Sequence, residues 1–389
     1  MAALSRRDLL RRGGLTAAAL AGGSLLAGCA EADTPDGAPA ADTGGEPGSD
    51  FAGQTLRLVV YSGLTENLYR DHFIDAFEQR TGATVELEAA WTEAAAKLAS
   101  ARGSDPPYDV IQSDPTQGRP LIDQGLIETL DPALVPNAAN FAPRLLETSL
   151  WTDGFGLPFH SSAMTLSWNT ELVSDGLTEW RQLLTTGGDR GVMIYKLAYM
   201  SLFTYAAMKA EADGAPGQAR EMFETDLAGV FDYAAANTGN VSYYWPATTN
   251  GVNALVRGEV AAGNMHGNGL LATLRAGQPV RGAVPQESIG YAQLMFSLTK
   301  GSPVPELGHA ALDFIASEDF QRALAASGEY AAAIPAVAQE QAAADEVWAA
   351  AFPHTDEDFA ALQYYPYDAY YENQVMIEDT WNREILRGA

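Results

Sequence analysis

The sequence predicts an α/β protein with two domains, in which helices cover parallel β-sheets. The first observation is that short apolar runs alternate with segments of helical spacing from Gln54 onward. The second is that another α/β block follows the first. The third is size: of the 389 residues, roughly 335 follow the last linker residue, and chains of that length usually divide into two domains.

The first block begins with QTLRLVVYSG, an apolar run ending in glycine that predicts a buried strand and a loop. TENLYRDHFIDAFEQRTG has helical spacing, with Thr65 as the predicted N-cap and Gly82 as the C-cap. The next strands are predicted at ATVELEAA and PYDVIQSD, and the next helices at TEAAAKLASARGSD and TQGRPLIDQGLIETLD. This order predicts a parallel sheet, whose ligands bind beyond the carboxyl ends of the strands.

The second block starts with two extended stretches in GFGLPFHSSAMTLSWN. Helices are predicted at LTEWRQLL, LAYMSLFTYAAMKA and QAREMFETDLAGVFDYAAAN. GVNALVRGEVAAGNMHGNGLLATLRAG reads as helix, strand, loop and helix, and its glycines are expected to let backbone N–H groups approach a ligand. A strand at IGYAQLMFSLTKGS and a helical pair at LGHAALDFIASEDFQRALAASGEYAAAIP complete the block.

The chain begins with the pattern of a secretion signal. SRRDLLRR is a twin-arginine start, and the weakly apolar run that follows is too short for a membrane helix. The run ends in LAGC, which resembles the lipobox of bacterial lipoproteins, so Cys29 is the expected lipidation site. Residues 1–29 are therefore predicted to be an export signal, and residues 30–53 a flexible linker rich in small and polar residues.

Composition excludes several partners and chemistries. The formal net charge of −27 disfavours nucleic acid and anionic lipid headgroups. Because Cys29 is the only cysteine, no internal disulfide and no cysteine nucleophile is expected. The motifs G-x-S-x-G, H-E-x-x-H and G-x-x-x-x-G-K-[ST] are absent, so a binding protein is favoured over an exported enzyme, and no cofactor is expected.

Five segments together resemble the extracellular solute-binding proteins of ABC importers. The resemblance covers most of the chain from Gln54, and its nearest group is the spermidine/putrescine-binding proteins. The segments are VVYSGLTENLYRDHFIDAFEQRTGATVEL, YDVIQSDPTQGRPLIDQGLIETLD, GLPFHSSAMTLSWNTELV, LVRGEVAAGNMHGNGLLATLRAG and YYENQVMIEDTWNREILRGA.

The resemblance implies a type II periplasmic-binding-protein fold, with two α/β lobes joined by a two-strand hinge. It places lobe 1 at residues 54–159 plus 292–362, and lobe 2 at residues 160–291 plus 363–389. It further implies a monomer outside the cytoplasm, anchored to the membrane through Cys29, that delivers a small solute to an ABC permease. A sensor that presents the solute to a membrane receptor shares this fold and stays open as an alternative.

In that fold, loops at strand ends face each other across a cleft. Tyr61 could stack on a ligand or pack on its own lobe, and Asp114 could be a plain helix cap. His160 and His266 favour hydrogen bonds to a solute over a metal site, because neither belongs to an HxH or HxxxH pair. The expected ligand-binding residues are Tyr61, Ser62, Glu66, Asp114, Thr116, His160, Ser161, Lys196, His266, Asn268 and Gln293.

Lys196 sets the expected charge of the solute, unless its side chain simply points to solvent. It lies where a strand gives way to a helix, a place where polyamine-binding relatives carry acidic residues, so an anionic or zwitterionic solute is expected there. A polyamine is the alternative. The tandem Tyr243-Tyr244 resembles the ligand pair of ferric-binding relatives and leaves iron as a further alternative. The tyrosine cluster from Tyr364 to Tyr371 is expected to pack the terminal helix against lobe 2.

Overall fold

The computed structural model describes residues 50–90, 92–101, 105–290 and 295–386. All of them lie in one compact unit that spans Glu46–Ala389. The predicted export signal, Cys29, Gln293 and the linker up to residue 49 lie outside the described residues. Within the described part, no helix has the length and apolar character needed to cross a membrane.

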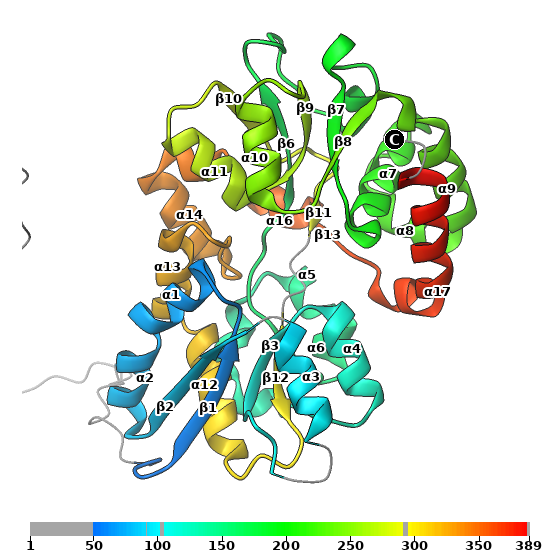
Figure 1. Ribbon diagram of the computed structural model, residues 1–389. Coiled ribbons are helices and arrows are strands. Elements are labelled where there is room, and N and C mark those ends of the chain that lie inside the picture. The colour runs from blue at the N-terminus through cyan, green and yellow to red at the C-terminus, as the bar shows by residue number, and fades with distance from the viewer. Residues whose placement is uncertain (1–49, 91, 102–104, 291–294, 387–389) are drawn as a thin grey trace, which may run out of the picture. The chain divides into compact units, whose positions relative to one another are not determined.

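Two separate β-sheets, each flanked by helices, organise this unit into two lobes (Figure 1). In the first lobe, β1 pairs in parallel with β2 and β3, which confirms the predicted parallel order, while β12 runs antiparallel to β3. Leu58 and Val59 on β1 belong to different hydrophobic clusters, so both faces of the sheet are covered. The strands, in sheet order, are β2 (Thr84–Ala89), β1 (Thr55–Val60), β3 (Val110–Ser113), β12 (Met295–Thr299) and β4 (Ile127–Glu128), with β5 (Leu157–Pro158) beside β12.

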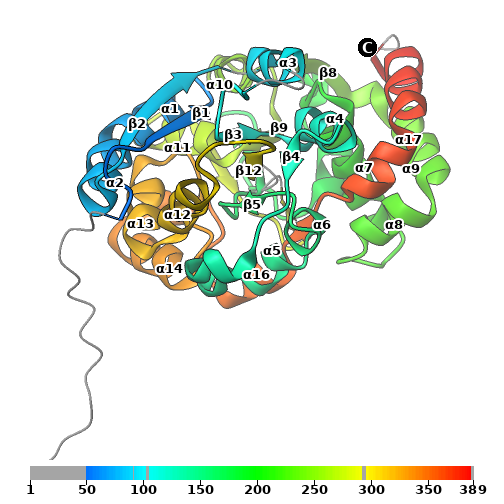
Figure 2. The same ribbon diagram turned by 90° about the horizontal axis from the view of Figure 1, so that it is seen from below.

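The helices of the first lobe connect its strands or cover its sheet (Figures 1 and 2). They are α1 (Leu64–His72), α2 (Ile74–Thr81), α3 (Thr92–Ser100), α4 (Pro115–Asp123), α5 (Pro143–Leu146), α6 (Ser149–Thr152), α12 (Pro305–Ala316) and α13 (Glu318–Ser327), with 3₁₀ turns at Pro132–Leu134 and Pro136–Asn140.

The second lobe has a mixed sheet in which β7 is parallel to β8 and β9, and β6 is antiparallel to β9. Its strands, in sheet order, are β10 (Val280–Ala283), β6 (Met164–Asn169), β9 (Ala262–His266), β7 (Val192–Tyr195) and β8 (Val241–Trp245). Its helices are α7 (Ala198–Ala212), α8 (Ala219–Thr225), α9 (Leu227–Ala236), α10 (Thr248–Val256), α11 (Gly267–Arg275) and α17 (Tyr367–Thr380), with a π-helical turn at Trp381–Ile385 and 3₁₀ turns at Trp180–Leu184, Gly188–Arg190 and Thr238–Asn240.

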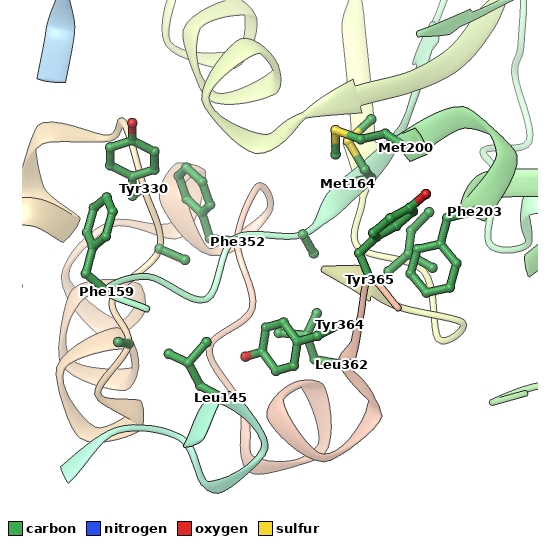
Figure 3. Packing of buried hydrophobic residues seen from close by; sticks show 14 of the residues in the cluster. Leu145, Phe159, Met164, Met200, Phe203, Tyr330, Phe352, Leu362, Tyr364 and Tyr365 are labelled. Atoms are coloured by element: carbon green, nitrogen blue, oxygen red, sulfur yellow. The ribbon is translucent and has the colours of Figure 1, made fainter. Parts of the chain in front are cut away.

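The chain passes between the lobes along segments that pack against one another. His160 and Ala332 form an antiparallel bridge, and the N–H of Ser161 donates to the carbonyl of Ala331 at 3.1 Å. Phe159, Tyr330 and Tyr364 point into the apolar packing around these crossings (Figure 3). Between the lobes lie the paired strands β11 (Ile289–Gly290) and β13 (Gln363–Tyr364), and the helices α14 (Pro335–Ala344), α15 (Glu346–Ala349) and α16 (Asp356–Ala361).

Three local predictions are wrong. Thr65 is inside α1 rather than its N-cap; Gly63 takes that position with φ 95°, a conformation that favours glycine. The helix is also interrupted at Phe73, whose fully buried ring stacks on Phe77 at 4.9 Å between centroids. Finally, the fold begins before Gln54, because Phe51 packs against the core and its N–H donates to the carbonyl of Thr81 at 3.1 Å.

Candidate functional site

A cavity of about 520 Å³ lies between the two sheets, within the size range of small-molecule sites. It lies where several strands of both lobes end, as expected for ligand sites of α/β folds. Five of its described lining residues are tyrosines, two are carboxylates, and none is a lysine or arginine. The lining residues are Tyr61, Ser62, Thr65, Asp114, Thr116, Gln117, Tyr195, Leu197, Tyr199, Met200, Pro246, Ala247, Thr248, Thr249, His266, Asn268, Glu329, Tyr330 and Tyr367.

Asp114 is both a helix cap and a cavity residue. Its Oδ1 accepts the N–H of Thr116 at 2.7 Å, which caps α4, and its Oδ2 accepts the side-chain amide of Gln117 at 2.9 Å. The Tyr61 hydroxyl lies 3.2 Å from Oδ2 and accepts the N–H of Asp114 at 2.6 Å. Burial, with the nearby charge of Asp114, raises the pKa of Tyr61 well above its usual value. These bonds hold a carboxylate and a neutral phenol rigidly at the first lobe's edge.

The facing wall comes from β9 and α11. His266 Nδ1 is 3.0 Å from the hydroxyl of Thr248, and its ring stands edge-on to Tyr195 and Trp245, each 5.3 Å away between centroids. Burial lowers the pKa of His266 to about 4, so the imidazole is neutral at pH 7. The Asn268 amide donates to Glu329 Oε2 at 3.1 Å.

The glycines around His266 allow close packing, and the expected approach of a ligand to their backbone N–H groups stays a prediction. A Cβ on Gly267 would lie 2.6 Å from the carbonyl oxygen of Ala351, and one on Gly269 would lie 2.5 Å from the methyl group of Thr248. Neither glycine has a positive φ. Their lack of a side chain therefore lets α11 approach its neighbours closely.

Glu329 is the most informative cavity residue that sequence reasoning missed. It follows α13 in the short sequence Gly328-Glu329-Tyr330, where the chain approaches the crossings. Burial raises its pKa above the usual range, although the hydrogen bond from Asn268 counters this. The Tyr330 hydroxyl is 2.9 Å from that of Thr65, which joins this segment to α1. A carboxylate after a glycine-ended helix gives no sequence signal, because only the tertiary fold brings it to the cavity.

Six predicted site residues, Tyr61, Ser62, Asp114, Thr116, His266 and Asn268, come together around the cavity, and their roles in binding stay predictions. Four others do not line it. His160 is fully buried, with Nδ1 3.1 Å from the hydroxyl of Ser162, and burial lowers its pKa to about 3. Ser161 is buried at the crossing, and Glu66 pairs with Arg70 at 2.9 Å on the surface of α1.

Lys196 is also outside the cavity lining. Its residue is exposed, while its backbone N–H donates to the carbonyl of Trp245 and its carbonyl accepts Trp381 Nε1. These backbone bonds fix the loop before α7, and the neighbouring Leu197 lines the cavity instead. The structure therefore gives no support to the predicted anion site at Lys196.

The tyrosine predictions have mixed outcomes. Tyr243 and Tyr244 lie on β8 and are not among the lining residues, and Tyr244 meets Trp381 edge-on at 6.0 Å. In the terminal cluster, Tyr365 packs against Phe203 at 5.4 Å, as expected for a packing role. Tyr367 from the same cluster lines the cavity, which was not foreseen.

Metal binding and a serine nucleophile can both be checked against the described residues. In this part of the chain, no group of three or more His, Cys, Asp or Glu side chains is arranged to hold a metal ion. One S-x-x-K sequence runs from Ser297 to Lys300 at the end of β12, and the Ser297 hydroxyl donates to the carbonyl of Phe155 at 2.7 Å. That serine is buried and does not line the cavity.

Comparison with protein families matches residues 72–354 to the family described as bacterial extracellular solute-binding protein. No match was found among the curated proteins. A solute-binding protein structure from Bordetella parapertussis has a TM-score of 0.69 at 17% identity, covering 86% of this chain and 99% of that one. An ABC transporter substrate-binding protein from Bradyrhizobium japonicum has a TM-score of 0.68 at 17% identity, covering 85% and 98%. A spermidine/putrescine transporter substrate-binding protein from Streptococcus pneumoniae has a TM-score of 0.64 at 17% identity, covering 84% and 99%.

Proposed function

Because this chain belongs to the bacterial extracellular solute-binding proteins, we propose that it captures a small organic cation between its lobes for an ABC importer. The family match places its work outside the cytoplasm. The importer role is supported by the ABC transporter proteins that share its fold. In this role the protein binds and releases its solute as a monomer and does not transform it.

The residues that line the cavity are the reason for proposing a cationic solute. Asp114 and Glu329 contribute two carboxylates, and no described lining residue is a lysine or arginine. Tyrosine rings attract ammonium groups through their faces and offer apolar surface to alkyl chains. A cation beside Glu329 would also offset the burial that raises the pKa of this carboxyl. The lining therefore favours the polyamine-like alternative over an anion held at Lys196.

Calorimetric titration of the ligand-stripped protein tests this proposal. The panel is putrescine, spermidine, γ-aminobutyrate, choline, succinate and ferric citrate. We expect binding of an amine, and at least tenfold weaker binding in Asp114→Asn and in Glu329→Gln, because each variant removes one negative charge. Asn still caps a helix, so α4 is retained in the first variant.

Asp319→Asn is the matched control, since this side chain is 94% exposed and lies outside the cavity. The control should bind like the unmodified protein. Binding of succinate alone, or equal amine affinity in all three variants, would contradict a cationic solute.

We also propose that the mature protein is tethered to the membrane through lipid on Cys29. The twin-arginine start and the LAGC sequence support this, together with the family's extracellular place. Cys29→Ser should move the exported protein from the membrane fraction to the soluble fraction, and intact mass should show a lipid only on the unmodified chain. Equal membrane content of both proteins would exclude a lipid tether.

A further inference from the structure

The terminal helix α17 is packed onto the second lobe. Trp381, in the π-helical turn that continues α17, is 1% exposed and donates Nε1–H to the carbonyl of Lys196 at 3.0 Å. Tyr370 is also 1% exposed and packs on Tyr199 of α7 at 6.0 Å between ring centroids. A displacement of the second lobe therefore carries α17 with it.

Helix α4 is fixed to the first lobe in the same way. It follows β3 directly, and Leu121 is 2% exposed in a cluster with Val59 and Ile111 of the first sheet. Figures 1 and 2 both show the beginning of α17 beside α4, so helices of different lobes meet at this edge of the molecule.

Arg119 of α4 contacts two residues of α17. Its guanidinium lies 5.4 Å from the centre of the Tyr371 ring, and its Nη1 is 3.8 Å from Asp368 Oδ1. Within α4, the 2.8 Å pair between Arg119 Nε and Asp123 Oδ1 orients the side chain. A groove of about 410 Å³ runs beside these contacts, so solvent reaches them. The groove is lined by Arg119, Pro120, Asp123, Asp368, Tyr371, Glu372 and Gln374.

The same two helices carry residues of the solute cavity. Asp114 is the N-cap of α4, and Tyr367 is one turn before Tyr371 on α17. The rings of Tyr367 and Tyr371 stack at 5.9 Å with an interplanar angle of 27°. Separation of α4 from α17 would therefore break the Arg119 contacts and open one side of the cavity.

We propose that Arg119, Tyr371 and Asp368 form a latch that favours the arrangement of the lobes in which α4 meets α17, here called closed, even without solute. A half-buried cation–π contact and an exposed ion pair are each weak. The latch therefore biases the equilibrium between open and closed lobes by about threefold to tenfold rather than locking it. A larger closed fraction before binding raises the apparent affinity by up to the same factor.

Spin-label distances in the solute-free full chain test the latch. The labels go on cysteines introduced at the exposed residues Ser100 of α3 and Asp232 of α9, in a Cys29→Ser background. Arg119→Ala and Tyr371→Leu should each shift the distance distribution toward the separation of open lobes. Tyr371→Phe should behave like the parent, because it keeps the aromatic ring.

Arg383→Ala is the charge-matched control, since Arg383 is 61% exposed and pairs with Glu384 at the far end of the terminal helix. Its distances should be unchanged. An unchanged distribution in both Arg119→Ala and Tyr371→Leu, at an unchanged unfolding midpoint, would overturn the latch. Since no solute is added, that result would leave the proposal of a cationic solute standing, and failed amine binding would likewise leave the latch standing.

Discussion

Two buried histidines are kept neutral by burial: His160, at a crossing of the chain between the lobes, and His266, in the cavity wall. His160 has no exposed surface and lies under the ring of Tyr330 at 4.5 Å between centroids. Transfer of a charged imidazole into such packing is costly, which is why its pKa falls to about 3. His266 follows the same rule in the cavity wall. Neither histidine therefore carries a positive charge at neutral pH that could attract an anion.

The neutral state of His160 predicts a loss of stability in acid. Its pKa is lowered on folding, so between about pH 6.5 and pH 3 the unfolded chain binds a proton that the folded protein does not. A difference of one pKa unit between the folded and unfolded states corresponds to about 1.4 kcal/mol. This histidine alone should therefore lower the free energy of unfolding by about 2 kcal/mol when the pH falls from 7 to 5. Urea unfolding at both pH values, compared with His160→Gln, measures this difference. A pH dependence equal in both proteins would mean that His160 titrates normally.

Secondary-structure elements at the site are positioned by close backbone contacts. Helix α11 begins at Gly267, whose Cα faces the carbonyl of Ala351 and the ring of Phe352. This contact joins α11, which carries Asn268 and directly follows His266, to the segment after α15. The site geometry therefore depends on residues that are distant in the sequence.

Gly267→Ala should destabilise the protein. The added Cβ would lie 2.6 Å from a backbone oxygen, which cannot move independently, so overpacking should cost about 1–3 kcal/mol. Thermal unfolding measures the loss. Gly239→Ala is the matched control, because a Cβ there meets nothing within 4 Å and Gly239 has no positive φ. Equal destabilisation by both changes would mean that the contact at Gly267 is readily relieved.

For the whole molecule, a formal net charge of −27 spreads self-repulsion over the surface. Salt screens such repulsion, with a Debye length of about 10 Å at 0.1 M. We therefore expect the unfolding temperature to rise as NaCl increases from 20 mM to 500 mM, followed by calorimetry. Sorbitol at matched osmolality separates screening from general exclusion effects. A flat response to salt would show that the existing ion pairs already balance the surface charge.

The sequence predicted the fold better than the site. Strands and helices follow from patterns within a short stretch of sequence, whereas the site combines residues that are far apart in the sequence. The apolar run of β1 and the helix that ends at Gly82 before β2 are determined by their own local sequence, and both were predicted. Glu329 and Tyr367 reach the cavity through a crossing and through the terminal helix, which no local pattern reveals. Lys196 was expected in the site from its place after β7, but local position does not determine where a side chain points.

The position of Glu329 has a mechanical consequence. It stands two residues before Ala331, which pairs with Ser161 at a crossing between the lobes. A solute that binds this carboxylate would therefore act close to the crossing between the lobes, which would serve as the pivot of any rotation of one lobe against the other. A displacement of a fraction of an ångström there would be magnified with distance from the pivot, and would be largest at the rims of the two lobes. A solute held at Glu329 would in this way alter the outer surface of the protein more than the cavity itself.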